Sequence, residues 1–279
     1  MDSFEQGLSM TIDQSKTTDG SFRASWPVPD EWQQGRGAWG GLVVGATIRA
    51  LTLVKPEPGR SVRTISCHMF GPVPNGDCVI EVAPVRRGAA MSTWAVSIWD
   101  PSGARCTESI VITGEARGED IDCSEWGTAT MPTAPDWQQV PAVPVAPPMG
   151  PVFGPHLEFR PIAGLPFSGS EARALGWSRF TEHSGPQEKR GWTAEELLAI
   201  VDGWWPAGYV RLTAPRTMAT VSFSAHLLVD PSSVPIGEPV LMESAVTSAY
   251  EGFTSEIRRL WSVDGRVLVE NLQSIVVVN

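Results

Sequence analysis

Apolar and polar residues alternate over six long segments of the chain, and these segments fall into two groups of three. The first group covers residues 79–85, 93–99 and 106–113, and the second covers 240–246, 255–261 and 267–278. A period of two is typical of β-strands with one buried face. Turn residues follow within each group, as in Asp100-Pro101-Ser102-Gly103 and Asp264-Gly265. Each group therefore predicts an antiparallel meander. Shorter candidate strands lie at 21–26, 156–162 and 177–181.

A helical segment precedes each meander. The first covers residues 39–51 and is followed by Pro56 and Pro58. The second begins at a capping box, in which Thr193 is followed by Glu196, and is expected to continue to about Trp205 before Pro206. Both segments are apolar on most of their faces, so both helices are predicted to be buried. A buried helix followed by a long meander suggests a sheet wrapped around that helix.

The two units resemble each other as an internal repeat. Residues 64–113 and 220–278 share landmarks at offsets of 156, 161, 162 and 162, in the pairs Thr64 and Thr220, Gly76 and Gly237, Trp99 and Trp261, and Gly103 and Gly265. Duplication explains the near-constant offset, although any two meanders share some features. We therefore predict an N-terminal unit over 1–114 and a C-terminal unit over 156–279. A Pro-rich segment over 115–155 between them is expected to be an extended surface linker without regular structure.

Composition narrows the function classes. The 279 residues carry 21 Lys and Arg against 31 Asp and Glu, which gives a net charge of −10 and disfavours nucleic-acid binding. No apolar run is long enough to span a membrane, and the first residues do not resemble a secretion signal. The four cysteines lack the spacing of a metal site or a disulfide framework, so we expect no metal and a reduced cytoplasmic location. They are Cys67, Cys78, Cys106 and Cys123.

This pattern resembles the acyl-CoA thioesterase II family of double hotdog proteins. The resemblance covers about residues 20–113 and 156–278, and is carried by Trp39-Gly40-Gly41, the turn at 85–88 with Ser92-Thr93, Asp202, Ala219-Thr220 and Leu272-Gln273. It implies an α+β fold in which two antiparallel sheets, each wrapped around a helix, form a pseudo-dimer within one chain. Departures follow Thr220 and Gln273, where the usual Asp-His and Glu-Gly are absent, and Arg86-Arg87 stands where the family has Arg-Asp. These differences indicate a divergent member.

The resemblance implies hydrolysis of an acyl thioester by a water held by Asp202, Thr220 and Gln273. Burial among apolar helix residues would raise the pKa of Asp202 and make it a better base, whereas a solvent-exposed helix end is the alternative. Thr220 and Gln273 can orient a water as neutral hydrogen-bonding groups, although both also suit ordinary strand positions. The first helix has Ala46 at the place of Asp202, so one site per chain is expected.

Further residues are candidates for binding the substrate. Backbone N–H groups of Gly40 and Gly41 at a helix start suit an oxyanion, and close helix packing is the alternative reason for glycine there. The 12 tryptophans are unusual beside 2 Tyr, and three of them are expected to shape an acyl tunnel, namely Trp39, Trp204 and Trp205. Coenzyme A, as part of the substrate and not a separate cofactor, needs arginines for its phosphates. The candidates named for that role are Arg86 and Arg87, with Arg60 and Arg63 also considered.

The sequence also contains features of other functional classes. The glycines at 35, 37 and 40 satisfy a dinucleotide-binding spacing, but a strand meander follows them and not alternating strands and helices. No GxSxG elbow is present. A hotdog enoyl-CoA hydratase or dehydratase would carry a His near Asp202, and none follows it. A non-catalytic acyl-CoA-binding hotdog is the other alternative. The partners expected are a small acyl thioester and a second copy of the chain, in a homodimer or a higher assembly.

Overall fold

The computed structural model describes residues 3–13, 20–54, 57–117, 123, 126–186 and 190–278. Its helices are α1 Phe4–Gly7, α2 Gly40–Val54, α3 Ala194–Ile200 and α4 Gly208–Arg211, with short 3-10 turns at Asp30–Trp32, Trp137–Gln139, Gly154–His156 and Pro231–Ser233. Strands of the N-terminal half are β1 Thr11–Asp13, β2 Phe22–Val28, β3 Gln33–Gln34, β4 Gly37–Ala38, β5 Arg60–Met69, β6 Gly76–Arg87, β7 Met91–Trp99 and β8 Arg105–Glu115. Strands of the C-terminal half are β9 Leu157–Ala163, β10 Arg173–Phe180, β11 Thr217–Leu227, β12 Val240–Tyr250, β13 Phe253–Trp261 and β14 Val267–Val278.

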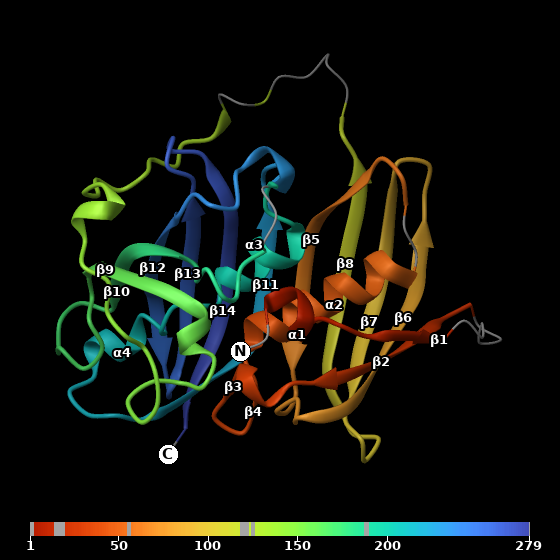
Figure 1. Ribbon diagram of the computed structural model, residues 1–279, viewed down its shortest axis with the longest axis horizontal. Coiled ribbons are helices and arrows are strands. Elements are labelled where there is room, and N and C mark those ends of the chain that lie inside the picture. Colours follow the sequence, from red (N-terminus) through yellow and green to blue (C-terminus); the bar gives the residue numbers. More distant parts are fainter. Residues whose placement is uncertain are drawn as a thin grey trace.

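One antiparallel sheet of twelve strands runs through both halves. Its order is β1-β2-β6-β7-β8-β5-β11-β14-β13-β12-β10-β9, so each half contributes a meander and the two meanders join where β5 pairs with β11. Helices α2 and α3 lie next to each other on one side of this sheet (Figure 1). A second, two-stranded sheet is formed by β3 and β4. The sequence prediction of two meanders, each following a buried helix, is confirmed.

The join between the halves reveals the symmetry of the duplication. Strand β5 pairs with β11 so that Ser66 faces Ser224, with His68 opposite Ser222 and Thr64 opposite His226. The pairing is symmetric: each β5 residue corresponds to the β11 residue numbered 158 higher, and exchanging the two strands leaves the pairs unchanged. Ser66 and Ser224 lie at the centre of this symmetry, with their hydroxyls 2.9 Å apart. The predicted match of Thr64 with Thr220 is therefore wrong by two residues. Thr64 corresponds to Ser222, and Thr220 corresponds to Val62.

Helix α2 forms as the sequence predicts. Its residues are buried around most of the helix, as its continuous apolar composition requires. Helix α3 begins at the predicted capping box, since Thr193 accepts from the backbone N–H of Glu196 and the Glu196 side chain accepts from that of Thr193. However, α3 ends at Ile200, five residues before the predicted end at Trp205. Tighter turn bonds replace the helical pattern there, from Asp202 N to Ala199 O (2.9 Å) and from Gly203 N to Ile200 O (2.9 Å).

The Pro-rich segment packs more closely than an extended linker would. It contains the 3-10 turn Trp137–Gln139, and Val143 pairs with Phe159 at the edge of the sheet. Val140 is buried in a small cluster with Trp177, Leu241 and Trp261, on strands of the C-terminal half. In Figure 1 the part of the segment from residue 126 onward runs beside the C-terminal half and leads into β9. It thereby covers one face of the C-terminal sheet strands. Within its described residues, the expectation that the segment lacks regular structure is wrong at these short elements and at the 3-10 turn that begins at Gly154.

Candidate active site

Asp202 lies in the tight turn that follows α3. The backbone of this turn is fixed from the N-terminal half, because the indole N–H of Trp39 donates to the carbonyl oxygen of Asp202 at 3.0 Å. Trp39 is fully buried and stacks on Phe153 with ring centroids 4.6 Å apart. Residues more than 160 positions apart therefore hold the Asp202 main chain in one place. The side chain of Asp202 keeps only 9% of its exposure.

The three predicted catalytic side chains form one hydrogen-bonded chain. Gln273 Nε2 donates to Asp202 Oδ1 at 2.9 Å, and Thr220 Oγ1 donates to Gln273 Oε1 at 3.0 Å. Gln273 Nε2 also donates to Asn271 Oδ1 at 3.1 Å. This arrangement fixes the amide orientation, because the reverse orientation would place Oε1 against two oxygen acceptors. Because Thr220 gives its proton to Gln273, its oxygen lone pairs remain available to accept from a further donor.

Burial and charge act on Asp202 in opposite directions. Removal from water raises the pKa of Asp202 above its usual value, and the nearby Glu256 carboxylate raises it further. The Arg258 guanidinium, Gln273 and the backbone N–H of Gly41 lower the pKa of Asp202, but burial dominates. A carboxylate with a raised pKa is a stronger base once it is ionised. The 9% exposure of the Asp202 side chain agrees with the burial expected from the sequence.

A buried ion pair lies beside Asp202 that sequence reasoning missed. Arg258 and Glu256 of β13 point to the same side of the sheet, with Arg258 Nε 2.8 Å from Glu256 Oε1. Arg258 Nη1 lies 3.7 Å from Asp202 Oδ1. A signal for this pair existed, because the strand at 255–261 carries two charged residues at alternate positions. The offset of 162 places the apolar Trp94 and Val96 at the same positions of the first copy.

The start of α2 meets the Asp202 carboxylate. A Cβ added to Gly40 would lie 2.6 Å from Asp202 Oδ2 and 3.4 Å from Met69 Cε, so a larger residue would displace the carboxylate from this position. A Cβ added to Gly41 would lie 2.3 Å from the Trp39 ring and 2.5 Å from the Ala199 carbonyl oxygen. Gly41 is thus required for packing of α2 against the end of α3. The structure brings both glycines to Asp202, and their predicted role at an oxyanion stays a prediction.

The other two tryptophans near the site differ in their surroundings. Trp204 is buried beneath β10, where it packs against Gly176 so tightly that a Cβ there would lie 2.5 Å from the indole ring. Trp205 is half-buried, and its indole N–H donates to Gly164 O at 2.9 Å. Both rings lie near Phe159 of β9. Their predicted role in an acyl tunnel stays a prediction.

The predicted arginines for coenzyme A lie at the opposite end of the N-terminal half from Asp202. Arg87 ends β6 and pairs with Glu57 at 3.1 Å. Glu57 in turn pairs with Arg60, the first residue of β5, whereas Met69, the last residue, lies beside Gly40. Ten strand residues span about 30 Å. The structure therefore does not bring Arg86 and Arg87 together with the Asp202 network.

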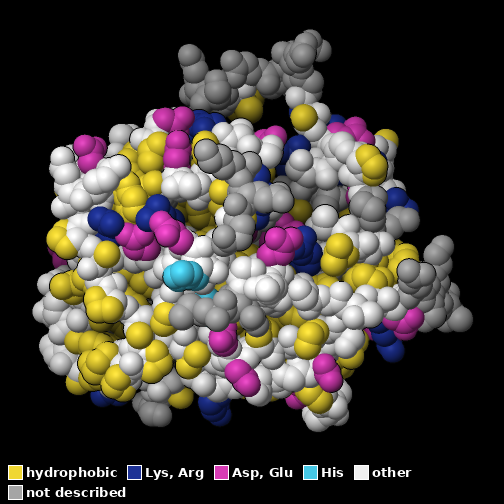
Figure 2. All heavy atoms as spheres, in the orientation of Figure 1, with side chains coloured by type: hydrophobic (Ala, Val, Ile, Leu, Met, Phe, Trp, Pro, Cys, Tyr) yellow, Lys and Arg dark blue, Asp and Glu magenta, His cyan; other side chains and the backbone are white. Residues whose placement is uncertain are grey.

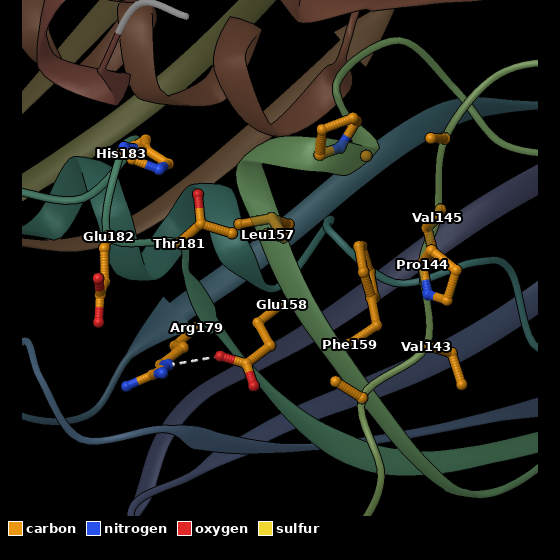
Figure 3. Close-up of a pocket in the computed structure, with 14 residues that line it drawn as sticks. Val143, Pro144, Val145, Leu157, Glu158, Phe159, Arg179, Thr181, Glu182 and His183 are labelled. Atoms are coloured by element: carbon orange, nitrogen blue, oxygen red, sulfur yellow. Dashed lines mark hydrogen bonds and ion pairs between the residues drawn. The ribbon is translucent and has the colours of Figure 1, made fainter.

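A surface groove of about 610 Å³ lies beside β9. It is formed by residues 142–146 and the ends of β9 and β10, and Figure 3 shows the Arg179–Glu158 ion pair on its wall. Leu157 lines this groove and also approaches Gly203, where a Cβ would lie 2.5 Å from Leu157 Cδ1. The Leu157 side chain thus reaches both the groove and the Asp202 turn.

Cysteine chemistry and metal binding have little support at this site. Cys67 of β5 is buried, and burial raises the pKa of its thiol to about 11, so it is protonated at neutral pH. Within the described ranges, no three His, Cys, Asp or Glu side chains converge as metal ligands would.

Acidic and basic side chains lie beside one another on the face of the molecule seen in Figure 2.

Comparison with known families identifies the lineage of the chain. Residues 28–114 match the acyl-CoA thioesterase N-terminal domain, and residues 128–277 match the acyl-CoA thioesterase C-terminal domain. The chain belongs to the acyl-CoA thioesterase family. This result confirms the resemblance found in the sequence. No curated protein sequence matches the chain significantly.

Solved structures support the double hotdog fold of this thioesterase family member. A hotdog-fold protein of unknown function from Alicyclobacillus acidocaldarius has a TM-score of 0.83 at 23% identity, over 99% of this chain and 98% of its own. An acyl-CoA thioesterase II from Mycobacterium marinum has a TM-score of 0.73 at 15% identity, over 99% of this chain and 98% of its own. At such identities the likeness establishes the fold alone. None of the described helices could cross a membrane.

Proposed function

We propose that this chain hydrolyses an acyl-CoA thioester with a water held by Asp202, Thr220 and Gln273. The observation that carries this proposal is the continuous hydrogen-bonded chain from Asp202 through Gln273 to Thr220, set at the start of α2. A water that donates one hydrogen bond to Asp202 and one to Thr220 keeps a lone pair free for the thioester carbonyl carbon. Family membership supports the same reaction class.

In the proposed reaction Asp202 acts as general base. It accepts a proton as the water oxygen attacks the carbonyl carbon, and the carbonyl oxygen becomes an oxyanion. The dipole of α2, whose positive end lies at Gly40 and Gly41, supports that charge, while the Gly41 N–H bonds to Asp202. Collapse of the tetrahedral intermediate breaks the carbon–sulfur bond, and the proton returns to the leaving thiolate. The products are a carboxylic acid and coenzyme A, with no separate cofactor.

Thiol release from a panel of acyl-CoA substrates tests this proposal. We expect turnover by the unaltered protein, and a loss of kcat/KM of about 1,000-fold in Asp202→Asn, since general bases contribute about 100- to 10,000-fold. Glu270→Gln is the matched control, because Glu270 is also a carboxylate but pairs with Arg259 away from the network. Unchanged thiol release in Asp202→Asn would rule out the assigned base. Binding without thiol release from any substrate would instead favour an acyl-CoA-binding protein.

We also infer a two-unit organisation with boundaries near 114 and 156, a cytoplasmic location and assembly into a homodimer or higher form. Three buried and unpaired cysteines fit a reducing compartment. Exposed apolar side chains such as Ile110 and Leu272 lie on two of the sheet strands. Light scattering of the purified protein tests the assembly, and a monomeric mass at micromolar concentration would contradict it.

A further inference from the structure

Arg258 and Glu256 form an ion pair beside Asp202 that is almost completely buried. Glu256 has no exposed surface, and Arg258 retains 2% of its exposure. Removal of two charges from water is costly unless each makes good hydrogen bonds. Burial of these two side chains therefore requires hydrogen bonds to other groups, and backbone groups of residues 201–207 provide them.

Both charges hold the turn that carries Asp202. Arg258 Nη1 donates to the carbonyl oxygens of Val201 at 3.2 Å and Trp204 at 3.4 Å, one on each side of Asp202 and Gly203. Glu256 Oε2 accepts from the backbone N–H of Ala207 at 2.8 Å. Three backbone groups of residues 201–207 are thus fixed to β13. The same guanidinium lies 3.7 Å from the Asp202 carboxylate and acts as its nearest counter-charge.

The other half of the protein shows that the fold does not require this pair. In β7 and β8 Trp94 pairs with Val111, as Glu256 pairs with Gln273 in β13 and β14. By the same register Val96 takes the place of Arg258. Trp94 and Val96 are both buried and pack in the main core. Apolar side chains therefore fill these two positions where no acid and no catalytic network are present.

We propose that Arg258 and Glu256 are positioning residues for Asp202, with Arg258 supplying both the grip on the turn and the counter-charge. This inference rests on the proposed function, since it concerns the same base. Among the residues that the structure describes, the charged groups that act on Asp202 are Arg258 and Glu256 of β13, and Asp202 in turn acts on Cys67 of β5. Cys67 stays neutral at working pH, so the β13 pair sets the electrostatic balance.

The two members of the pair should displace the pH profile in opposite directions. Arg258 lowers the pKa of Asp202, so Arg258→Met should move the acid limb of kcat/KM to higher pH. Glu256 raises that pKa, so Glu256→Gln should move the acid limb to lower pH. Loss of the grip on the turn should also lower kcat in Arg258→Met by about 100-fold, the effect expected of a misplaced catalytic group. A residue with a purely structural role would not produce opposite displacements.

Two further variants separate charge from folding. Arg258→Lys keeps the charge but loses the planar fork, so kcat should fall while the acid limb stays near its original pH. The double variant Glu256→Gln with Arg258→Met removes both charges, which often preserves stability, and should still show an acid limb at higher pH. Arg259→Met is the matched control, because its side chain pairs with Glu270 and lies on the opposite face.

The outcomes distinguish this inference from the proposed function. Opposite displacements, with inactive Asp202→Asn, would support both. Folded variants with unchanged acid limbs, alongside inactive Asp202→Asn, would overturn the role of Arg258 and Glu256 but leave the base intact. Full activity of Asp202→Asn would overturn both. If Arg258→Met does not fold, the double variant takes its place. An acid limb at higher pH would then support the role of the pair, and an unchanged acid limb would overturn it.

Discussion

The two halves of the chain share a fold but differ in the side chains that they present to their helices. At matched sheet positions the C-terminal half carries Thr220, Glu256, Arg258 and Gln273, whereas the N-terminal half carries Val62, Trp94, Val96 and Val111. All four N-terminal residues belong to the main hydrophobic core. Polar groups at these positions therefore serve something other than folding, because the apolar set builds the same architecture.

The halves also differ in what covers their outer surface. Trp261 is buried with Val140 of the Pro-rich segment, while its counterpart Trp99 is half-buried, with Arg105 stacked 4.5 Å above its ring. The C-terminal half thus has both a polar interior and an additional cover. A covered sheet limits the access of water to buried charges from behind, which strengthens their interactions. Under the proposed function, the C-terminal copy is the chemical half, which carries the catalytic side chains, and the N-terminal copy is the packing half.

Exchange of one residue between the halves tests this comparison most strongly. Gln273→Val places in β14 the residue found at the matching position of β8, Val111. It removes the hydrogen-bonded link between Asp202 and Thr220. We expect kcat/KM to fall by about 100-fold, as for a misplaced catalytic group. Thiol release measures this effect, and thermal unfolding monitors the fold. Retained activity would place the chemistry elsewhere.

The reciprocal exchange is the control for that experiment. Val111→Gln places an amide in the apolar half, where Val111 is fully buried. An unpartnered buried amide costs about 1–3 kcal/mol of unfolding free energy. We therefore expect lower stability with unchanged kcat per folded molecule. A large loss of kcat in this variant would mean that both halves take part in the reaction.

Substitution of the two glycines that begin α2 should have different effects, one mainly on activity and the other mainly on stability. Gly40→Ala would press on the Asp202 carboxylate, which can move aside, so we expect kcat/KM to fall about tenfold or more, with a modest change in stability. Gly41→Ala would collide with the Trp39 ring and the Ala199 carbonyl oxygen, both held in place, and should cost about 1–3 kcal/mol of unfolding free energy. Kinetics and chemical denaturation of both variants measure the two effects. The reverse ranking would contradict the assigned contacts.

Much of this architecture could be predicted from the sequence because it depends on local patterns. Alternation marked the long strands, and the Thr193–Glu196 capping box marked the start of α3. The short motif around Trp39-Gly40-Gly41 and the separate positions Asp202, Thr220 and Gln273 identified residues that the structure then joined. These features follow from the residues themselves and from their neighbours within a few positions.

Features that depend on register and on distant contacts could not be predicted in the same way. The landmarks in the sequence pair Thr64 with Thr220, whereas the β5–β11 pairing, with bulges at Arg63 and Val221, sets an offset of 158 in those strands. The end of α3 at Ile200 depends on a turn that Trp39 and Arg258 hold from other parts of the chain. The burial of Val140 likewise depends on where the linker meets the sheet.

The pH dependence of stability offers a test that needs no substrate. Burial raises the pKa of Asp202 in the folded state, so folding favours its protonated form. Asp202 therefore contributes stability below its unfolded pKa, and this contribution is lost as pH rises through the raised folded value. We expect Asp202→Asn to be more stable than the unaltered protein at neutral pH and to lose that advantage in acid. Thermal unfolding from pH 4 to pH 8 measures the difference, and a constant difference would contradict the raised pKa.

Trp204 and Trp205 provide the finest test of how the chemical half holds its substrate. Trp204 is buried against Gly176, so Trp204→Ala should cost about 3–5 kcal/mol of unfolding free energy. Trp205 is half-buried near Phe159, which also lines the groove of Figure 3. Removal of the Trp205 ring would open space between Phe159 and the Asp202 turn. We expect Trp205→Ala to shift preference modestly toward longer or bulkier acyl groups, measured as ratios of kcat/KM across the acyl-CoA panel. An unchanged profile would mean that the acyl chain leaves the site on the side of Met69, where β5 ends, and not toward β9.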